Sequence, residues 1–280
     1  ISFSSKTVPV LAILRKNLLN NKNTQIIYSG ELPEFFDGEI LRSVYGYTFD
    51  LLKVENASAI PEFDGNTVFI SQQDEISSFE LTSNIDFFIN VHSHLGSVLL
   101  VNGEQNESYI SEIQHVRRRE TIAMTPVNSL AALEGLTEKS TSKSRESNAS
   151  DKASVLDSIA AVTGSNTMAL VASSGLSIQY AILMGLIHDA LENHTGKAIK
   201  IIVPPNCYGG TNDQARRVAA CIDNVEVMDL PVDGGNDMVQ SIDLVLAKIA
   251  SEDAIPYIIA EIPTNPRVEV PDLVQLKNVL

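Results

Sequence analysis

The stretches Ala198–Val203 (AIKIIV), Val225–Leu230 (VEVMDL) and Tyr257–Glu261 (YIIAE) decide the fold. Each has the length and the content of β-branched and apolar residues that are typical of a buried strand. The periodicity of amphipathic helices lies between them, over Tyr208–Cys221 and Met238–Ala250. Strands that alternate with helices of ten or more residues predict βαβ units, a parallel sheet and right-handed crossovers. The sequence therefore predicts an α/β fold.

The same alternation extends to both sides of these strands. A strand over Thr167–Ala172 and a helix over Gly175–Leu191 are expected before them, and a helix over Asp272–Leu280 is expected after them. A short helix is expected over Ala153–Val162. The polar stretch Glu138–Ser154 has no apolar periodicity, so we expect a linker or exposed loop that divides the chain.

The first part of the chain predicts a small α/β domain that precedes the parallel sheet. We divide the chain into this N-terminal domain of unassigned role at 1–110, a connecting segment at 111–150 and a second domain at 151–280. The N-terminal elements expected are a helix over Val8–Leu19 and strands over Gln25–Tyr28, Thr67–Ser71, Ile85–Val91 and Ser97–Val101.

Composition and charge exclude several classes of protein. The 280 residues are 44% hydrophobic, which is enough for true cores, and 20 Lys and Arg against 35 Asp and Glu give a formal charge of −15. Such a charge argues against nucleic acid and against anionic membranes as main partners. No apolar run reaches the length of a membrane helix. Two cysteines, Cys207 and Cys221, are expected to be free thiols in a reducing, cytoplasmic compartment.

Polar residues follow three of the four expected parallel strands, at the edge where ligands bind in open α/β sheets. Ser174, Gly175 and Leu176 open a helix and offer backbone N–H groups to a phosphate, although an ordinary serine N-cap explains them as well. Tyr208 brings an aromatic ring suited to stacking, and Asn265 brings a fixed amide, although each also suits an ordinary turn. Together they describe a pocket for a planar, phosphorylated ring.

These motifs resemble those of the Cys/Met-metabolism (transsulfuration) family of pyridoxal-phosphate enzymes, of the cystathionine γ-synthase and β-lyase type. The family's phosphate-binding turn is similar to SSGLS at 173–177, its stacking Tyr-Gly-Gly-Thr to 208–211, and its Glu-Thr/Ser-Pro-Thr-Asn-Pro segment to 261–266. The resemblance covers about residues 144–280. It implies the parallel sheet of fold-type I aminotransferases with helices on both faces, here in part. It also implies pyridoxal 5′-phosphate as the cofactor, and homoserine esters, cystathionine or related amino acids as substrates for C–S bond formation or cleavage.

The resemblance also implies a site residue and a partner from the polar stretch. SRESNAS at 144–150 is similar to the family's arm, whose arginine reaches the phosphate of a neighbouring subunit. Arg145 would then bind the phosphate of a neighbouring subunit within a homodimer or homotetramer. The guanidinium group suits this role because it is always charged and its planar set of N–H donors matches a phosphate. Lys143 and Ala149 depart from the Tyr and Pro of that pattern.

Two residues that this chemistry needs are expected beyond Leu280. In the family, a lysine holds the cofactor covalently and an Asp keeps its ring nitrogen protonated, and both follow the Thr-Asn-Pro loop. The chain as given is therefore expected to be inactive, with the activity belonging to a longer parent. The alternative is a non-catalytic binding or regulatory protein that retains the fold.

Two other classes of site are weaker on the sequence. His92 and His94 have the spacing that places both rings on one face of a strand, but no third metal ligand is evident nearby, so no metal site is predicted. A dinucleotide site is not predicted either, because no Gly-x-Gly-x-x-Gly turn follows the first strand of the βαβ series.

Overall fold

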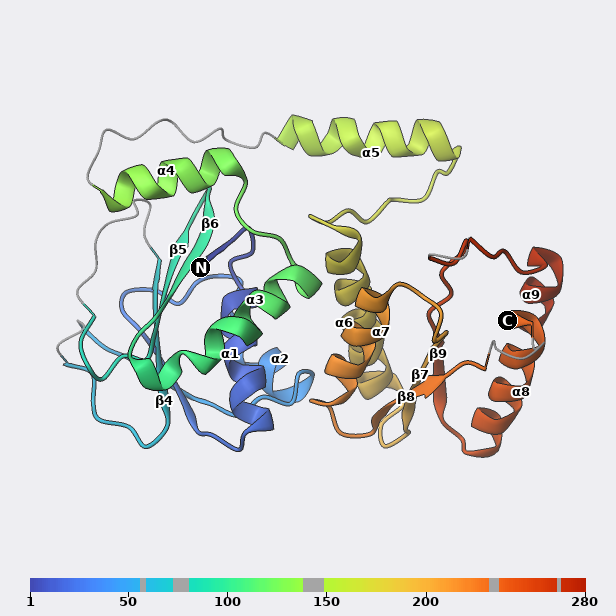
Figure 1. Ribbon diagram of the computed structural model, residues 1–280, viewed down its shortest axis with the longest axis horizontal. Helices are drawn as coiled ribbons and strands as arrows, with labels where there is room; N and C mark the ends of the chain where they lie inside the picture. Colours follow the sequence, from blue (N-terminus) through green and yellow to red (C-terminus); the bar gives the residue numbers. More distant parts are fainter. Residues whose placement is uncertain (56–58, 73–80, 138–148, 232–236, 266–267) are drawn as a thin grey trace. The chain divides into compact units, whose positions relative to one another are not determined.

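A computed structural model describes residues 1–55, 59–72, 81–137, 149–231, 237–265 and 268–280 (Figure 1). The chain forms two compact units. The first contains Ile1–Asp37 and Thr48–Ile178, and the second contains Gly38–Tyr47 and Gln179–Leu280. A short segment from the N-terminal part of the chain therefore groups with the C-terminal unit. Each unit is described by itself.

The first unit is built on a mixed six-stranded sheet of order β1-β6-β5-β4-β2-β3. Neighbouring strands among β2, β3, β4 and β5 are parallel, whereas β6 runs antiparallel to both β5 and β1. The predicted N-terminal helix and its four predicted strands are confirmed, with shifted ends. The elements are β1 Ser2–Phe3, α1 Val8–Leu19, β2 Thr24–Tyr28, β3 Asp50–Lys53, β4 Asn66–Gln72, β5 Phe87–His92, β6 Gly96–Val101, α3 Ser108–Glu120 and α4 Pro126–Leu136.

Both faces of this sheet are covered, because successive side chains of a strand point to opposite sides. On one face, the rings of Phe88 and Phe69 stack with their centroids 5.9 Å apart. Leu100, on the same face, packs against these rings and also against a second cluster, which includes Val98 of β6 and Ala131 of α4. Phe87, the neighbour of Phe88, points the other way and packs against Tyr109 of α3 at 4.8 Å. In Figure 1, α1 and α3 lie together on that second face, where the two helices are in contact.

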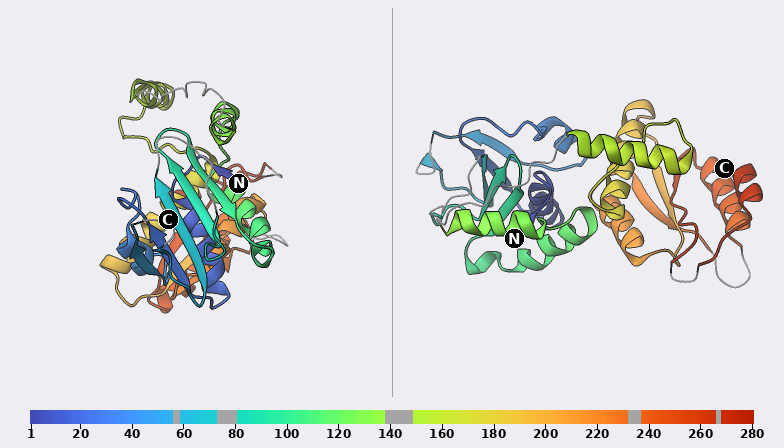
Figure 2. Two further views of the ribbon diagram at one scale, coloured as in Figure 1. Left: turned by 90° about the vertical axis from the view of Figure 1, so that its left-hand side faces the viewer. Right: turned by 90° about the horizontal axis from the view of Figure 1, so that it is seen from above.

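The second unit contains three parallel strands in the order β8-β7-β9. Figures 1 and 2 show α6 and α7 on one face of this sheet and α8 and α9 on the other. The βαβ units, the parallel sheet and the helices on both faces are thus confirmed for this part of the chain. The elements are α2 Gly38–Ser43, α6 Gly175–Asn193, β7 Ile199–Val203, α7 Gly209–Ala219, β8 Val225–Asp229, α8 Met238–Ser251, β9 Ile255–Ile258 and α9 Leu273–Val279.

One hydrophobic cluster of the second unit lies between the sheet and α8. All five residues of β7 are buried, and Ile202 packs with Ile242 and Ile249 on the inner face of α8. An aspartate caps the start of each helix on this side. Asp237 accepts a hydrogen bond from the backbone N–H of Gln240 in α8, and Asp272 accepts from the backbone N–H groups of Val274 and Gln275 in α9.

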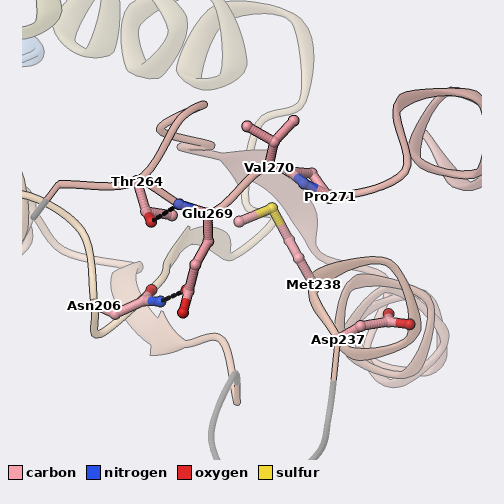
Figure 3. A pocket seen from close by; sticks show the side chains of 7 residues that line it. All are labelled: Asn206, Asp237, Met238, Thr264, Glu269, Val270 and Pro271. Carbon is pink, nitrogen blue, oxygen red and sulfur yellow. Dashed lines mark hydrogen bonds between the residues drawn. The ribbon is translucent and has the colours of Figure 1, made fainter. Parts of the chain in front are cut away.

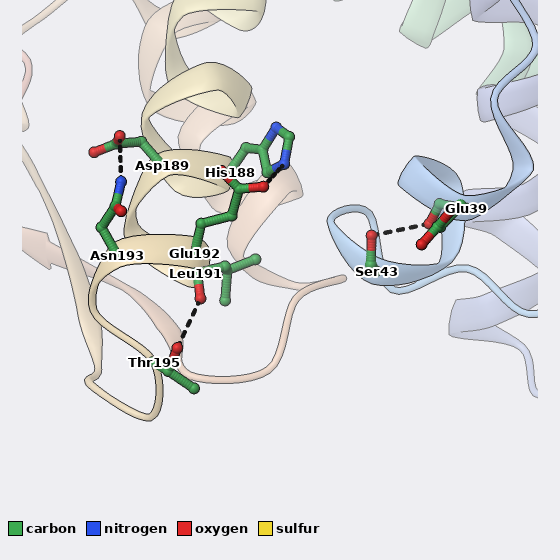
Figure 4. Close-up of polar contacts among 8 residues, drawn as sticks. All are labelled: Glu39, Ser43, His188, Asp189, Leu191, Glu192, Asn193 and Thr195. Carbon is green, nitrogen blue, oxygen red and sulfur yellow. Dashed lines mark hydrogen bonds and ion pairs between the residues drawn. The ribbon is translucent and has the colours of Figure 1, made fainter.

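Short-range polar contacts stabilise the last turns of α6 (Figure 4). His188 lies 3.2 Å from Glu192, and the amide of Asn193 donates to Asp189 at 2.9 Å. Both pairs are four residues apart, the spacing at which side chains meet on a helix. The same figure shows a contact of this kind in α2, where the Ser43 hydroxyl donates to the carbonyl of Glu39.

The strand predicted over Thr167–Ala172 is wrong, because these residues form no strand. Met168 and Leu170 remain 83% and 69% exposed. Apolar content alone does not make a strand, since a strand also needs a partner for its backbone groups. The preceding helix is longer than predicted: α5 runs over Ala149–Thr163, and none of its residues at 150–163 is buried.

The stretch from Tyr109 to Leu136 consists almost wholly of the helices α3 and α4, which group with the first unit. In the described part of the chain, no helix is long and apolar enough to cross a membrane.

Candidate functional site

Tyr208 begins α7 at the carboxyl edge of the three-stranded sheet, as predicted for a residue that follows β7. It occupies the N-cap position with φ −51° and ψ 128°, and 44% of the residue is exposed. Its backbone N–H donates to the carboxylate of Glu261 at 2.5 Å. A residue that follows β7 is thereby tied to the segment that follows β9, so two strand ends are connected at one edge.

Asn265 lies in that second segment and is exposed. The residue before it, Thr264, is buried and bonds to Glu269 twice: the Thr264 N–H donates to the Glu269 carbonyl, and the Thr264 hydroxyl accepts from the Glu269 N–H, both at 3.0 Å. The exposed Asn265 therefore follows directly after a residue whose position is fixed by two hydrogen bonds. The structure connects the Tyr208 and Asn265 segments through Glu261, a residue to which the sequence alone assigned no role.

Ser174 immediately precedes α6, and Gly175 and Leu176 belong to the first turn of that helix. Ser174 is an N-cap: its hydroxyl accepts from the Ser177 N–H at 3.1 Å, and the Ser177 hydroxyl accepts from the Ser174 N–H at 2.8 Å. Gly175 is exposed, and a Cβ at this position would meet no atom within 4 Å. Arg145 lies outside the described residues.

Hydrogen bonds join α6 and α7 one turn further along. The Gln179 amide donates to Gln214 at 2.9 Å and accepts from the Thr211 hydroxyl at 3.3 Å. Thr211 is the last residue of the Tyr-Gly-Gly-Thr motif, and Gln214 is completely buried. The motif is thus held against the helix that precedes it in the chain.

Cys207 precedes Tyr208 and is a buried, free thiol. Burial, helped by the negative charge of Glu261, raises the pKa of this thiol above its ordinary value. Burial and a raised pKa both disfavour the thiolate, which is the nucleophilic form of cysteine.

A pocket of about 230 Å³ opens beside these residues, between the segments that follow β7 and β9 and the first turn of α8 (Figure 3). The Asn206 amide donates to the Glu269 carboxylate at 3.0 Å on one side of it. Sequence reasoning missed this pocket, because its residues come from three separate segments and carry no shared motif. The lining residues are Asn206, Asp237, Met238, Thr264, Glu269, Val270 and Pro271.

The two histidines considered as metal ligands differ in their surroundings. β5 ends at His92, whose Nδ1 accepts hydrogen bonds from the backbone N–H groups of His94 and Leu95 at 3.0 and 3.2 Å. His94 lies in the following turn, so the two residues do not share one strand face. Among the residues described by the structure, no group of three or more His, Cys, Asp or Glu side chains is arranged to hold a metal ion.

Comparisons with known protein families, with curated proteins and with solved structures find no match to this chain.

Proposed function

We propose that the chain is part of a pyridoxal-phosphate-dependent enzyme of the transsulfuration type, which catalyses C–S bond formation or cleavage with homoserine esters, cystathionine or related amino acids as substrates. The observation that carries the proposal is the position of Tyr208. This exposed tyrosine precedes the first turn of α7 at the carboxyl edge of a parallel sheet. Its backbone N–H is hydrogen-bonded to Glu261, which belongs to the segment that carries Asn265. The carboxyl edge is where α/β sheets bind ligands.

The chemistry of the candidate residues fits the cofactor. Tyr208 would stack on the pyridine ring, and the exposed amide of Asn265 would donate to its phenolic oxygen. On the sequence, Ser174, Gly175, Leu176 and Arg145 would hold the phosphate, the first three through a helix start and the last through its charge. When bound, the cofactor supplies an electron sink for the bonds of the substrate's α-carbon.

Binding of pyridoxine 5′-phosphate to the whole chain tests the proposal. This probe has the ring and the phosphate but no aldehyde, so it does not react with surface lysines. We expect saturable binding in equilibrium dialysis, about two- to thirteenfold weaker in Tyr208→Leu and nearly unchanged in Tyr208→Phe, since stacking contributes about 0.5–1.5 kcal/mol. Tyr28→Leu, at the end of β2, is the control. Equal binding by Tyr208→Leu and the unchanged chain would contradict the proposal.

A second candidate function is binding of the cofactor without catalysis. It is favoured by the positions of the second unit's described lysines. Lys197 bonds to Asp253, and Lys200 bonds to Glu226 at 2.7 Å, near the amino end of the strands and away from the candidate edge. The other two, Lys248 and Lys277, lie within helices α8 and α9.

Borohydride reduction after incubation with pyridoxal 5′-phosphate separates the two functions. Attachment to one defined lysine, detected by peptide mass spectrometry and lost in Tyr208→Leu, would support catalysis by this chain. Saturable binding with only scattered, Tyr208-independent labelling would support binding alone.

A further inference from the structure

One polar side chain links the two helices whose starts carry candidate cofactor residues. Gln179 lies in the second turn of α6, beside α7 on the same face of the sheet (Figure 1). Its amide donates to the side chain of Gln214 at 2.9 Å and accepts from the Thr211 hydroxyl at 3.3 Å. Both partners belong to α7 and are buried. Gln179 therefore directs a donor and an acceptor at one neighbouring helix.

This link lies close to both helix starts. Thr211 is in the first turn of α7, directly after the N-cap Tyr208 and two glycines. On the other side, α6 begins at Gly175, and a helix rises about 1.5 Å per residue, so Gln179 lies only about 6 Å further along the helix axis. A shift of α7 along α6 would thus change the distance between Tyr208 and the turn at Ser174.

A polar contact between two helices restricts their relative position more than an apolar contact does. The other inward-facing residues of the middle of α6 include Leu183, Met184 and Ile187, and apolar packing of this kind tolerates changes of shape. A hydrogen bond depends on both distance and angle, and a buried polar group that loses its partner is costly. The bonds of Gln179 therefore favour one register of α6 against α7.

We propose that Gln179 is a positioning residue, which holds Tyr208 at a fixed distance from the candidate phosphate turn at Ser174. The inference rests on the proposed cofactor site. A ligand with a planar ring and a phosphate gains from both contacts only when the two are correctly spaced, and a displacement of about 1 Å is enough to lose much of that gain. Gln179 acts through α7, and it lies outside the motifs on which the family resemblance is based.

Two probes that differ only in the phosphate, pyridoxine 5′-phosphate and pyridoxine, test the proposal in equilibrium dialysis. Both have the ring that would stack on Tyr208, but only the first has a group for the phosphate turn. We expect the unchanged chain to bind the phosphorylated probe at least about tenfold more tightly, since hydrogen bonds to a charged group are strong. In Gln179→Met, which keeps the length of the side chain but cannot donate, this ratio should fall to about twofold or less, while the affinity for pyridoxine changes little.

The ratio of the two affinities separates positioning from a general loss of folded protein, which would weaken both probes equally. Thr211→Val removes one of the two hydrogen bonds and should lower the ratio by a smaller factor. Gln240→Met is the matched control, because it is the same change at an exposed position in the first turn of α8. An unaltered ratio in Gln179→Met would overturn the proposal.

Hydrogen exchange followed by NMR tests the same inference without a ligand. The N–H of Thr211 donates to the carbonyl of Tyr208 at 2.9 Å, so its exchange reports on the start of α7. We expect about tenfold faster exchange at Thr211 in Gln179→Met, and no change at Ser241, whose N–H donates to the carbonyl of Asp237 at the start of α8. If neither probe bound to the unchanged chain, the proposed cofactor site would fail. Unaltered exchange at Thr211 would overturn the role of Gln179 whatever the probes show.

Discussion

Buried polar side chains in the first unit connect α1, β4 and α3. The Tyr109 hydroxyl donates to Asn66 Oδ1 at 2.8 Å and contacts Asn17 Oδ1, and Asn17 in turn donates to Thr24 at 2.7 Å. All four residues are buried. Because a buried polar group without a partner is costly, each member depends on the others to remain satisfied.

The titration of Tyr109 gives a pH-dependent prediction. Burial, and then the charge of Asp86, raise its pKa from 10.0 to about 12. The folded state therefore keeps the proton that the unfolded chain releases near pH 10, so this contribution to stability is complete below pH 10 and is lost as the pH rises toward 12. We expect the free energy of unfolding of the first unit to fall across this window, and less steeply in Tyr109→Phe.

Denaturant unfolding at several pH values, followed with tyrosinate absorbance, measures this effect. At neutral pH, Tyr109→Phe should cost about 1 kcal/mol, because it leaves amide oxygens unpaired in the interior. Tyr28→Phe, in the same unit, serves as the control. Identical slopes between pH 10 and 12 for Tyr109→Phe and the unchanged chain would show that Tyr109 is not the group responsible.

The ion pair between Arg15 and Glu120 gives a second prediction at this scale. Both side chains are at most 2% exposed, and Glu120 Oε2 has no hydrogen-bond partner. Glu120→Gln should destabilise the first unit by about 3 kcal/mol, because it leaves the arginine charge buried without its counter-charge. The double variant Arg15→Met, Glu120→Leu should recover most of this loss. A double variant less stable than Glu120→Gln would contradict this account.

At the scale of elements, the sequence was sufficient wherever a segment carried its own periodicity. The strands β7 and β8 could be predicted because short runs of β-branched and apolar residues are typical of buried strands, and the helices α7 and α8 because their apolar residues recur with the helix period. The failure at Thr167–Ala172 has a physical cause: the segment has the composition of a strand, but whether a neighbouring strand accepts its backbone hydrogen bonds is decided by the tertiary fold.

The candidate site could also be predicted only in part. The positions of Tyr208 and Asn265 could be predicted, because a residue that follows a parallel strand must lie at the carboxyl edge of the sheet. Glu261 and Asn206 could not be assigned their roles, because those roles rest on contacts with residues 53 and 63 positions away in the chain. The sequence SSGLS suits a phosphate-binding helix start or an ordinary N-cap, and Ser174 is an N-cap in the structure.

The segment Gly38–Tyr47, which groups with the second unit, gives a prediction about an element. Gly46 has φ +71°, and a Cβ there would lie 2.7 Å from the backbone oxygen of Cys221, two residues beyond the end of α7. Gly30 has nearly the same φ, +74°, but no atom within 4 Å of such a Cβ. Both Gly→Ala substitutions introduce backbone strain of about 1 kcal/mol, and only Gly46→Ala adds a clash with backbone.

We therefore expect Gly46→Ala to lower the free energy of unfolding by at least about 1 kcal/mol more than Gly30→Ala does. Chemical denaturation of both variants measures the difference. Equal losses would mean that Gly46 does not pack closely on the end of α7.

At the scale of the whole molecule, each unit has its own core. The cluster around Phe69 and Phe88 lies entirely in the first unit, and the cluster around Ile202 and Ile242 lies entirely in the second. A part of a chain with its own hydrophobic core is expected to unfold as a cooperative unit of its own. The −15 charge adds repulsion in both units, and salt should weaken it.

Two matched substitutions test this independence. Ile89 of β5 and Ile242 of α8 are both completely buried, one in each unit. Ile→Ala at either position creates a cavity that costs about 3 kcal/mol, so the local free energy of opening should fall by that amount. Hydrogen exchange followed by mass spectrometry should show faster exchange across the first unit alone in Ile89→Ala and across the second alone in Ile242→Ala. If either substitution accelerated exchange in both units equally, the two cores would form one cooperative structure, and unfolding free energies could no longer be assigned to one unit.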